Sequence, residues 1–255
     1  MRLAAVIVLA GCGRFGFDSR MTTSDGAPDT SRDTSSDTSI DSPADTAMVC
    51  GLSCDGFDSV SLGSQWMLDT AQGTVTLDST HVHSGAAAAH MHVNAITSSI
   101  TNPRAELVTY QGLPVTGTLY ARAWMYFQSS VPPSPFAQMI NFADTAGEGI
   151  SMGSRNAVIA NNDYTSTTYA ESATGLPLDA WTCVMFEMPS GTTGTARVYL
   201  GGTELTDIAL PVTTAQPAPD HLYLGLEWVG TLSSQPPVDI WVDDFAMDTA
   251  PLPCT

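Results

Sequence analysis

Short runs in which apolar and polar residues alternate follow one another along most of the chain after residue 50. A period of two is typical of strands that bury one face, and the Gly, Pro, Asn and Asp clusters between the runs are typical of turns. Almost none of this region has the spacing of a helix. We expect strands at 104–110, 117–128, 136–144, 181–188, 196–202, 221–230 and 238–247, with others near Phe57 and Met152.

A further hairpin is expected where four of the five histidines gather, in the segment HVHSGAAAAHMHV. Residues 74–83 alternate, Ser84 and Gly85 mark a turn, and residues 86–96 alternate again. With this hairpin the strands number about ten to twelve. Such a count in about two hundred residues predicts an all-β fold, a two-sheet antiparallel jelly-roll sandwich.

The same histidines raise the question of a metal site. His81 and His83 would point to one side of a strand, as would His90 and His92, so each pair could supply nitrogen ligands. No cysteine or carboxylate lies at a tight supporting spacing in the sequence. Because β-structure alone explains the spacing, we favour solvated strands over a metal site.

The N-terminus predicts export. Residues 1–11 combine an Arg, an apolar run and small residues, which is typical of a signal peptide, and the run is too short to cross a bilayer core of about 30 Å. The LAGC sequence ending at Cys12 resembles the lipobox of bacterial lipoproteins. The resemblance implies lipid on Cys12, and Gly13 after it implies sorting to the outer membrane or cell surface of a Gram-negative bacterium.

Residues 12–49 are rich in Ser, Thr and Asp, with Asp at every fourth position from 25 to 45. Like charges at this spacing oppose a helix, and little apolar surface is available to bury. We expect a disordered acidic tether that joins a lipid anchor to one domain at 50–255. A calcium-binding acidic repeat is less favoured, because the segment lacks the Gly turns of such loops.

The net charge and the cysteine content limit the kinds of partner and the chemical role of the cysteines. The formal net charge is -18 and the chain has no lysine, which argues against nucleic acid as a partner. With Cys12 assigned to lipid, two disulfides are expected among Cys50, Cys54, Cys183 and Cys254, in any of three pairings. A four-cysteine zinc site is less favoured, since only the first two are close in sequence.

Five motifs follow one another in the domain: CDGFDS (54–59), HSGAAAAHMHV (83–93), PLDAWTCVMFEM (177–188), RVYLGGTEL (197–205) and IWVDDFAM (240–247). Their order resembles that of the concanavalin A-like lectin/glucanase jelly rolls, including the laminin-G-like and polysaccharide-lyase branches. The resemblance implies a concave sheet on which a sugar chain lies. It also implies calcium where the first and last strands meet, for which Asp55 and Asp58 face Asp243 and Asp244 in our expectation.

Two segments offer residues for a sugar groove. In YARAWMYF, the side chains of Tyr120, Arg122 and Trp124 share one face of a strand, and the alanines between them share the core face. RAELV (104–108) resembles the Arg-x-Glu-Leu strand of alginate-lyase-like and heparin-lyase-like enzymes, and FAQMINF (136–142) stands where their Gln-containing strand would follow. The ligand-binding residues we expect are Arg104, Glu106, Tyr120, Arg122, Trp124 and Gln138.

The resemblance to lyases is incomplete, because the residue expected to be a catalytic His is Ile140 or Asn141, and the late Tyr motif has no clear counterpart. The carboxylate triplet of a retaining glycosidase is also missing. We therefore expect a monomer that binds a polysaccharide or glycoconjugate and has no catalytic residue. A lyase acting on a uronate polymer and a protein-binding, adhesin-like module are the alternatives.

Overall fold

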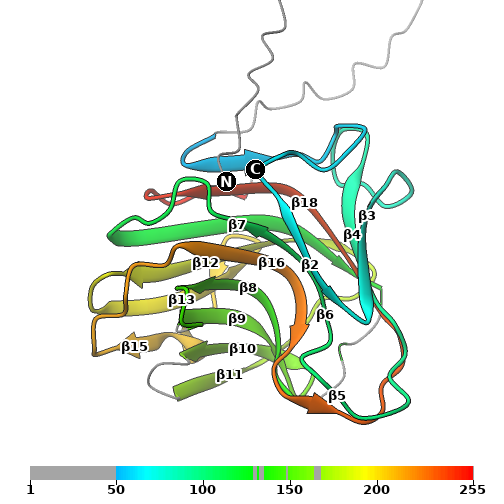
Figure 1. Ribbon diagram of the computed structural model, residues 1–255. Helices are drawn as coiled ribbons and strands as arrows, with labels where there is room; N and C mark the ends of the chain where they lie inside the picture. The colour runs from blue at the N-terminus through cyan, green and yellow to red at the C-terminus, as the bar shows by residue number, and fades with distance from the viewer. Residues whose placement is uncertain (1–49, 129–130, 132–134, 148, 164–167, 255) are drawn as a thin grey trace, which may run out of the picture. The chain divides into compact units, whose positions relative to one another are not determined.

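Two antiparallel β-sheets pack face to face in the computed structural model, which describes residues 50–128, 131, 135–147, 149–163 and 168–254 (Figure 1). This confirms the predicted all-β sandwich. The described residues contain no α-helix, and no helix among them is long and apolar enough to cross a membrane. The expected signal peptide, Cys12 and the tether lie outside the described residues.

The larger sheet consists of β1 (Ser53–Asp55), β3 (Gly73–Asp78), β4 (Ala88–Val93), β7 (Gly117–Phe127), β12 (Trp181–Ser190), β13 (Gly194–Leu200), β14 (Thr203–Glu204), β15 (Leu210–Val212) and β18 (Val238–Asp248). Its order is β14-β13-β12-β7-β18-β4-β3, with β1 paired to β18 and β15 paired to β13. We call it the nine-stranded sheet.

The seven-stranded sheet consists of β2 (Met67–Ala71), β6 (Arg104–Thr109), β8 (Ala137–Ala143), β9 (Gly149–Arg155), β10 (Val158–Asp163), β11 (Thr168–Gly175) and β16 (His221–Trp228), in the order β11-β10-β9-β8-β16-β6-β2. A two-stranded pair, β5 (Ile100–Thr101) with β17 (Thr231–Leu232), and the short 3-10 helix η1 (Thr206–Ile208) complete the described elements. The strands outnumber our expectation, because β2, β10 and β11 alternate too weakly to be recognised and β5, β14, β15 and β17 are only two or three residues long.

The core fills the space between the sheets. The residues that the sequence assigned to the inner face of β7, from Ala121 to Phe127 at every second position, are all buried there. The rings of Phe142 on β8 and Phe186 on β12 stack across the two layers at 6.1 Å. Burying each large apolar side chain contributes about 1.5–3 kcal/mol, so this interface is the main source of stability.

The predicted hairpin is present, with one correction. β3 and β4 pair along their length, but His81 and His83 lie in the loop between them rather than on a strand. The loop folds over the outer face of the nine-stranded sheet, where the ring of His83 stacks on Trp124 at 3.8 Å. The strand therefore ends earlier than the alternation suggests, at Asp78, which accepts a hydrogen bond from the backbone N–H of Thr80.

The two expected disulfides are Cys50–Cys54 and Cys183–Cys254. The second joins β12 to the C-terminal segment, which also covers the outer face of the nine-stranded sheet. A small second apolar cluster forms there, in which Leu252 packs with Met185 and Tyr120. The part of this face over β7 and β12 is therefore covered by the chain itself.

Gly225 allows β16 to lie close to β6. Its φ of +148° is unfavourable for other residues, and a Cβ atom would lie 2.5 Å from the carbonyl oxygen of Ala105. The two strands could not keep their register around a larger side chain. Gly175 is a useful contrast, because the nearest atom to a Cβ there is 3.8 Å away.

We predict that Gly225→Ala lowers the free energy of unfolding by about 2–4 kcal/mol, through backbone strain and the clash with β6. Gly175→Ala should change it by less than about 1 kcal/mol. Urea unfolding of the two variants and the wild type measures both effects. Equal stability of the two variants would show that the close approach at Gly225 is relaxed in solution.

Candidate functional site

A cleft of about 370 Å³ lies on the outer face of the seven-stranded sheet. Along β6 and β16 its residues alternate with core residues, so the same alternation that builds the core directs polar groups into the cleft. The cleft is lined by Asp69, Asn102, Arg104, Gln138, Asn141, Ala143, Gly147, Tyr223, Glu227 and Val229.

An irregularity in β8 brings two amides into the cleft. The pairing of β8 with β9 shifts between Gln138 and Ile140, so one extra residue is accommodated on β8. Met139 and Ile140 both join the core, and the side chains of Gln138 and Asn141, three positions apart, both line the cleft. Regular alternation would have placed them on opposite faces.

Two glutamates lie at the base of the cleft. Burial raises the pKa of Glu227 to about 7, and the nearby Asp69 also raises it, against the effect of Arg104. Burial and the negative charge of Glu227 raise the pKa of Glu106 well above its usual range. Gln138 donates a hydrogen bond to Glu227. At neutral pH Glu227 is therefore close to half protonated, and Glu106 holds its proton more tightly than an exposed glutamate does.

Arg104 is the one cation of the cleft among the described residues, and its charge is already paired. Its Nε donates to Asp69 at 2.7 Å, and its Nη1 donates to the carbonyl oxygen of Asn102 at 3.1 Å. Burial lowers the pKa of Arg104, but the hydrogen bond and charge of Asp69, followed by the charges of Glu227 and Glu106, raise it above its ordinary value. The cleft is consequently acidic in balance, even though it contains an arginine.

A row of polar and aromatic residues crosses the sheet beside these groups. Strand pairing aligns Tyr223 with Asn141, Asn141 with Ser151, Ser151 with Asn162, and Asn162 with Tyr169. The Oδ1 of Asn141 is buried and has no hydrogen-bond partner among the described residues. Tyr223 stands at the β16 end of the row, and its ring stacks on that of His221 with 5.8 Å between the ring centroids.

Comparison with known proteins gives the family. Residues 56–250 match the polysaccharide-lyase-like family described as Cip1-like, core domain. The chain belongs to the Cip1-like family. No curated protein matches this Cip1-like chain.

Two solved structures show the same fold as this Cip1-like domain. One is the cellulose induced protein Cip1, with a TM-score of 0.65 and 20% identity, covering 80% of this chain and 100% of that chain. The other is an endo-beta-1,4-glucuronan lyase from the fungus Trichoderma reesei, with a TM-score of 0.55 and 16% identity, covering 74% of this chain and 93% of that chain. At these identities the likeness establishes the jelly-roll fold alone.

The six expected ligand-binding residues fall into two groups in the Cip1-like domain. Arg104 and Gln138 line the cleft, and Glu106 lies buried beside them. Tyr120, Arg122 and Trp124 belong to β7 of the other sheet. The expectation that the two groups line one groove is therefore wrong, because the core separates them.

Arg122 has a structural environment instead. It is 6% exposed, and its guanidinium donates to the carbonyl oxygens of Pro253 at 2.7 Å and Asp244 at 3.1 Å. Burial lowers its pKa. These contacts hold the C-terminal segment against the outer face of the nine-stranded sheet, under which Tyr120 also packs.

The acids expected to bind calcium accept hydrogen bonds from N–H and O–H groups. Asp243 is fully buried and accepts from the backbone N–H groups of His83 and Ser84. Asp244 accepts from the side chains of the same two residues, and Asp58 from the backbone N–H of Ala86. Hydrogen-bond donors therefore occupy carboxylate oxygens that calcium would need as ligands. Calcium binding by these acids stays a prediction.

Sequence reasoning missed Asp69, Asn141, Tyr223 and Glu227 as cleft residues. A signal was present in HLYLGLEW, where Tyr223, Gly225 and Glu227 alternate with leucines. A glutamate in such an apolar strand is a candidate for function. For Asn141 no signal existed, because its position depends on the irregularity of β8.

The raised pKa of Glu227 leads to a prediction. Its folded-state value of about 7 lies above the usual 4.5, so the folded state holds the proton more tightly. The stabilisation is complete below about pH 4.5 and is lost as the pH rises through about 7. Relative to the wild type, Glu227→Gln should therefore gain up to about 3 kcal/mol of unfolding free energy between these pH values.

Urea unfolding at a series of pH values measures this gain. Glu204→Gln, on the edge of the other sheet, is the matched control and should follow the wild type. A constant difference between Glu227→Gln and the wild type at every pH would contradict the raised pKa.

Proposed function

We propose that this domain binds a neutral polysaccharide in the cleft of the seven-stranded sheet without cleaving it. The polar row from Tyr223 to Tyr169 supplies amide and hydroxyl groups for sugar hydroxyls, and its tyrosines supply faces on which sugar rings stack. The fold that the domain shares with a polysaccharide lyase supports a carbohydrate as the ligand class.

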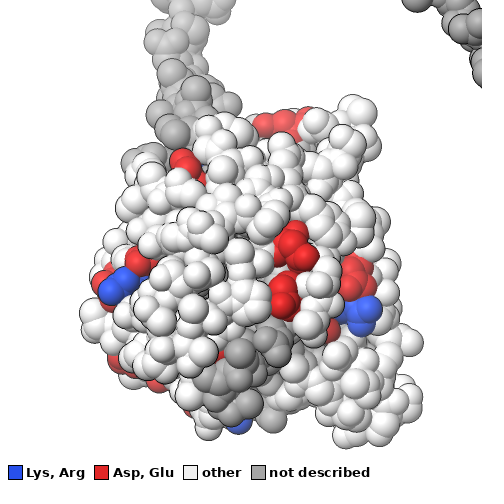
Figure 2. Space-filling view, turned by 60° about the vertical axis from the view of Figure 1, so that its left-hand side comes forward, with Lys and Arg blue, Asp and Glu red and all other residues white. Residues whose placement is uncertain are grey.

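The observation that carries this proposal is that every arginine of the domain is already paired with an acid or with backbone carbonyl groups. The domain has no lysine and four arginines, each engaged: Arg104 with Asp69, Arg122 with backbone carbonyls, Arg155 with Glu171 and Arg197 with Glu187. On the face displayed in Figure 2, acidic surface exceeds basic surface. The cleft lining contains two acids, Asp69 and Glu227, and its one arginine is already paired, so no unpaired cation in the described lining balances a uronate and a neutral chain is favoured.

Export supports the same proposal. If residues 1–11 are a signal peptide and residues 12–49 form the lipid-anchored tether that the sequence predicts, the domain stands outside the cell, where it can meet polysaccharides. Binding in the cleft would then attach the cell surface to such a polymer.

A uronate lyase is the second candidate, because Glu227 has the pKa of a general base near neutral pH. In such a reaction Glu227 takes the proton from carbon 5 of the uronate, the electron pair forms the double bond to carbon 4, and the bond from carbon 4 to the glycosidic oxygen breaks. That oxygen takes up a proton from water. Arg104 and Gln138 would contact the uronate carboxylate.

The test is titration calorimetry of the full chain with cello-oligosaccharides, xylo-oligosaccharides and a glucuronan. We expect saturable binding of a neutral chain, weakened about tenfold or more by Tyr223→Ala, because a stacked ring is lost. Tyr120→Ala, on the other sheet, is the control and should bind as the wild type does. Binding by neither class of sugar would overturn the proposal and leave a protein partner as the ligand.

Ultraviolet absorbance recorded on the same mixtures distinguishes the two candidates, because each lyase cleavage creates an unsaturated product that absorbs. We expect no increase with any of the three sugars. An increase with glucuronan that Glu227→Gln abolishes, while binding persists, would establish the lyase in place of the binding module.

A further inference from the structure

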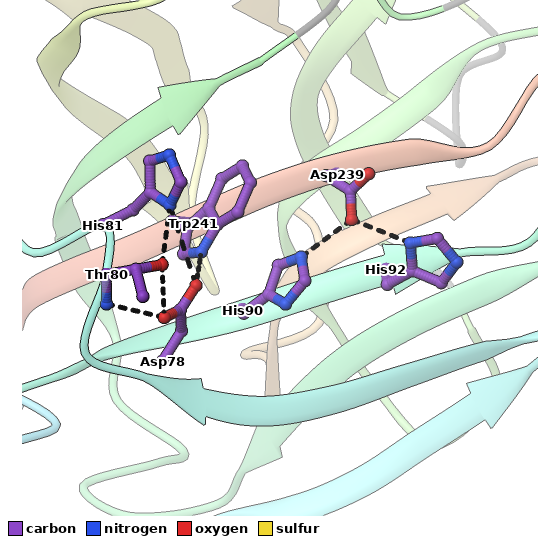
Figure 3. Close-up of polar contacts among 7 residues, drawn as sticks. All are labelled: Asp78, Thr80, His81, His90, His92, Asp239 and Trp241. Atoms are coloured by element: carbon purple, nitrogen blue, oxygen red, sulfur yellow. Dashed lines mark hydrogen bonds and ion pairs between the residues drawn. The ribbon is translucent and has the colours of Figure 1, made fainter.

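Two histidines and an aspartate converge on the outer face of the nine-stranded sheet, away from the cleft. His90 and His92 alternate on β4, so their side chains share a face, and the pairing of β4 with β18 sets Asp239 directly opposite His92. The Nε2 of His90 and the Nδ1 of His92 lie 2.8 Å and 2.7 Å from the same oxygen of Asp239. Figure 3 shows both rings turned toward this carboxylate.

The ring of His90 is held in place by its neighbours. It stacks on the indole of Trp241 at 4.4 Å with an angle of 8° between the planes, and the Nε1 of Trp241 donates to Asp78 at 2.8 Å (Figure 3). Burial would raise the pKa of Asp78, but hydrogen bonds from Thr80 and Trp241 lower it to about 2. Asp78 therefore stays charged and keeps the indole, and with it the imidazole, in a fixed orientation.

We propose that His90, His92 and Asp239 bind a zinc ion. The three ligand atoms lie within 4.8 Å of one another, and this is the one group of at least three such side chains that the described part of the chain brings so close together. Imidazole nitrogen and carboxylate oxygen are ordinary zinc ligands at about 2.0–2.2 Å, which sets tetrahedral ligands about 3.3 Å apart. The carboxylate oxygen needs to move by roughly half an ångström from each nitrogen to admit the ion.

The site would be open on one side. All three side chains are partly exposed, at 22%, 30% and 26% for His90, His92 and Asp239. A fourth coordination position is therefore accessible to water or to a donor group of another molecule. An ion here would also bridge β4 and β18, so the folded domain should gain stability when zinc is present.

The zinc site and the cleft are formed by different strands. The cleft belongs to the seven-stranded sheet and the three ligands to the nine-stranded sheet, with the core between them. Zinc binding can therefore be tested independently of the sugar ligand, and loss of one function leaves the other in place.

The experiment is titration calorimetry of the chelator-treated full chain with zinc chloride. Every protein carries Cys12→Ser, so that the thiol of the N-terminal segment does not compete. We expect one saturable site per chain, an increase in melting temperature, and shifts of the ring signals of two of the five histidines in nuclear magnetic resonance spectra. Magnesium at equal concentration should produce none of these, because it prefers oxygen ligands.

Three variants assign the site. Asp239→Asn and the double variant His90→Gln, His92→Gln should each weaken zinc binding about tenfold or more, and His92→Gln alone provides the test if either is unstable. His221→Gln, a histidine of the other sheet, is the matched control and should bind as before. Unchanged binding in the first two variants, or no binding by the parent protein, would overturn the proposal.

Discussion

The packing of two sheets against each other determines which side chain of every strand can face outward. Because strands alternate, each residue that joins the core commits its neighbours to the opposite face. The leucines of β16 fill the core and thereby present Tyr223 and Glu227 to the cleft. The same rule on β4 buries Met91 and turns His90 and His92 outward. Both sites described here are consequences of how the core is filled.

The outer faces of the two sheets differ in accessibility, because the chain covers part of the nine-stranded sheet and leaves a cleft on the seven-stranded sheet. The loop after β3 and the C-terminal segment lie over part of the nine-stranded sheet, held by the Cys183–Cys254 disulfide and by Arg122. Side chains that look suited to a sugar groove, such as Trp124, are used there to anchor the loop. The seven-stranded sheet keeps an open cleft that polar groups line.

Burial also controls the electrostatics of the cleft. Glu106 and Glu227 lie close together under partial exclusion of water, which makes two negative charges costly and favours retention of protons. Asp69 remains paired with Arg104, the one cation that the described residues place in the cleft, so its charge is not available to attract an acidic polymer. The cleft therefore combines hydrogen-bonding capacity with little attraction for anions, and this combination distinguishes it from a site built to neutralise uronates.

The sequence by itself determined the class of fold, the position of most long strands and the composition of the core face, because these depend on the local period of apolar residues. It also indicated the domain at 50–255 and the Arg104, Glu106 and Gln138 part of the site. Which side chains meet across the sheets was decided by tertiary structure. The register of β18 brings Asp239 to His90 and His92, the irregularity at Met139 turns Asn141 into the cleft, and the loop and tail close the face of Arg122. These outcomes depend on contacts between residues far apart in the chain, which no local pattern records.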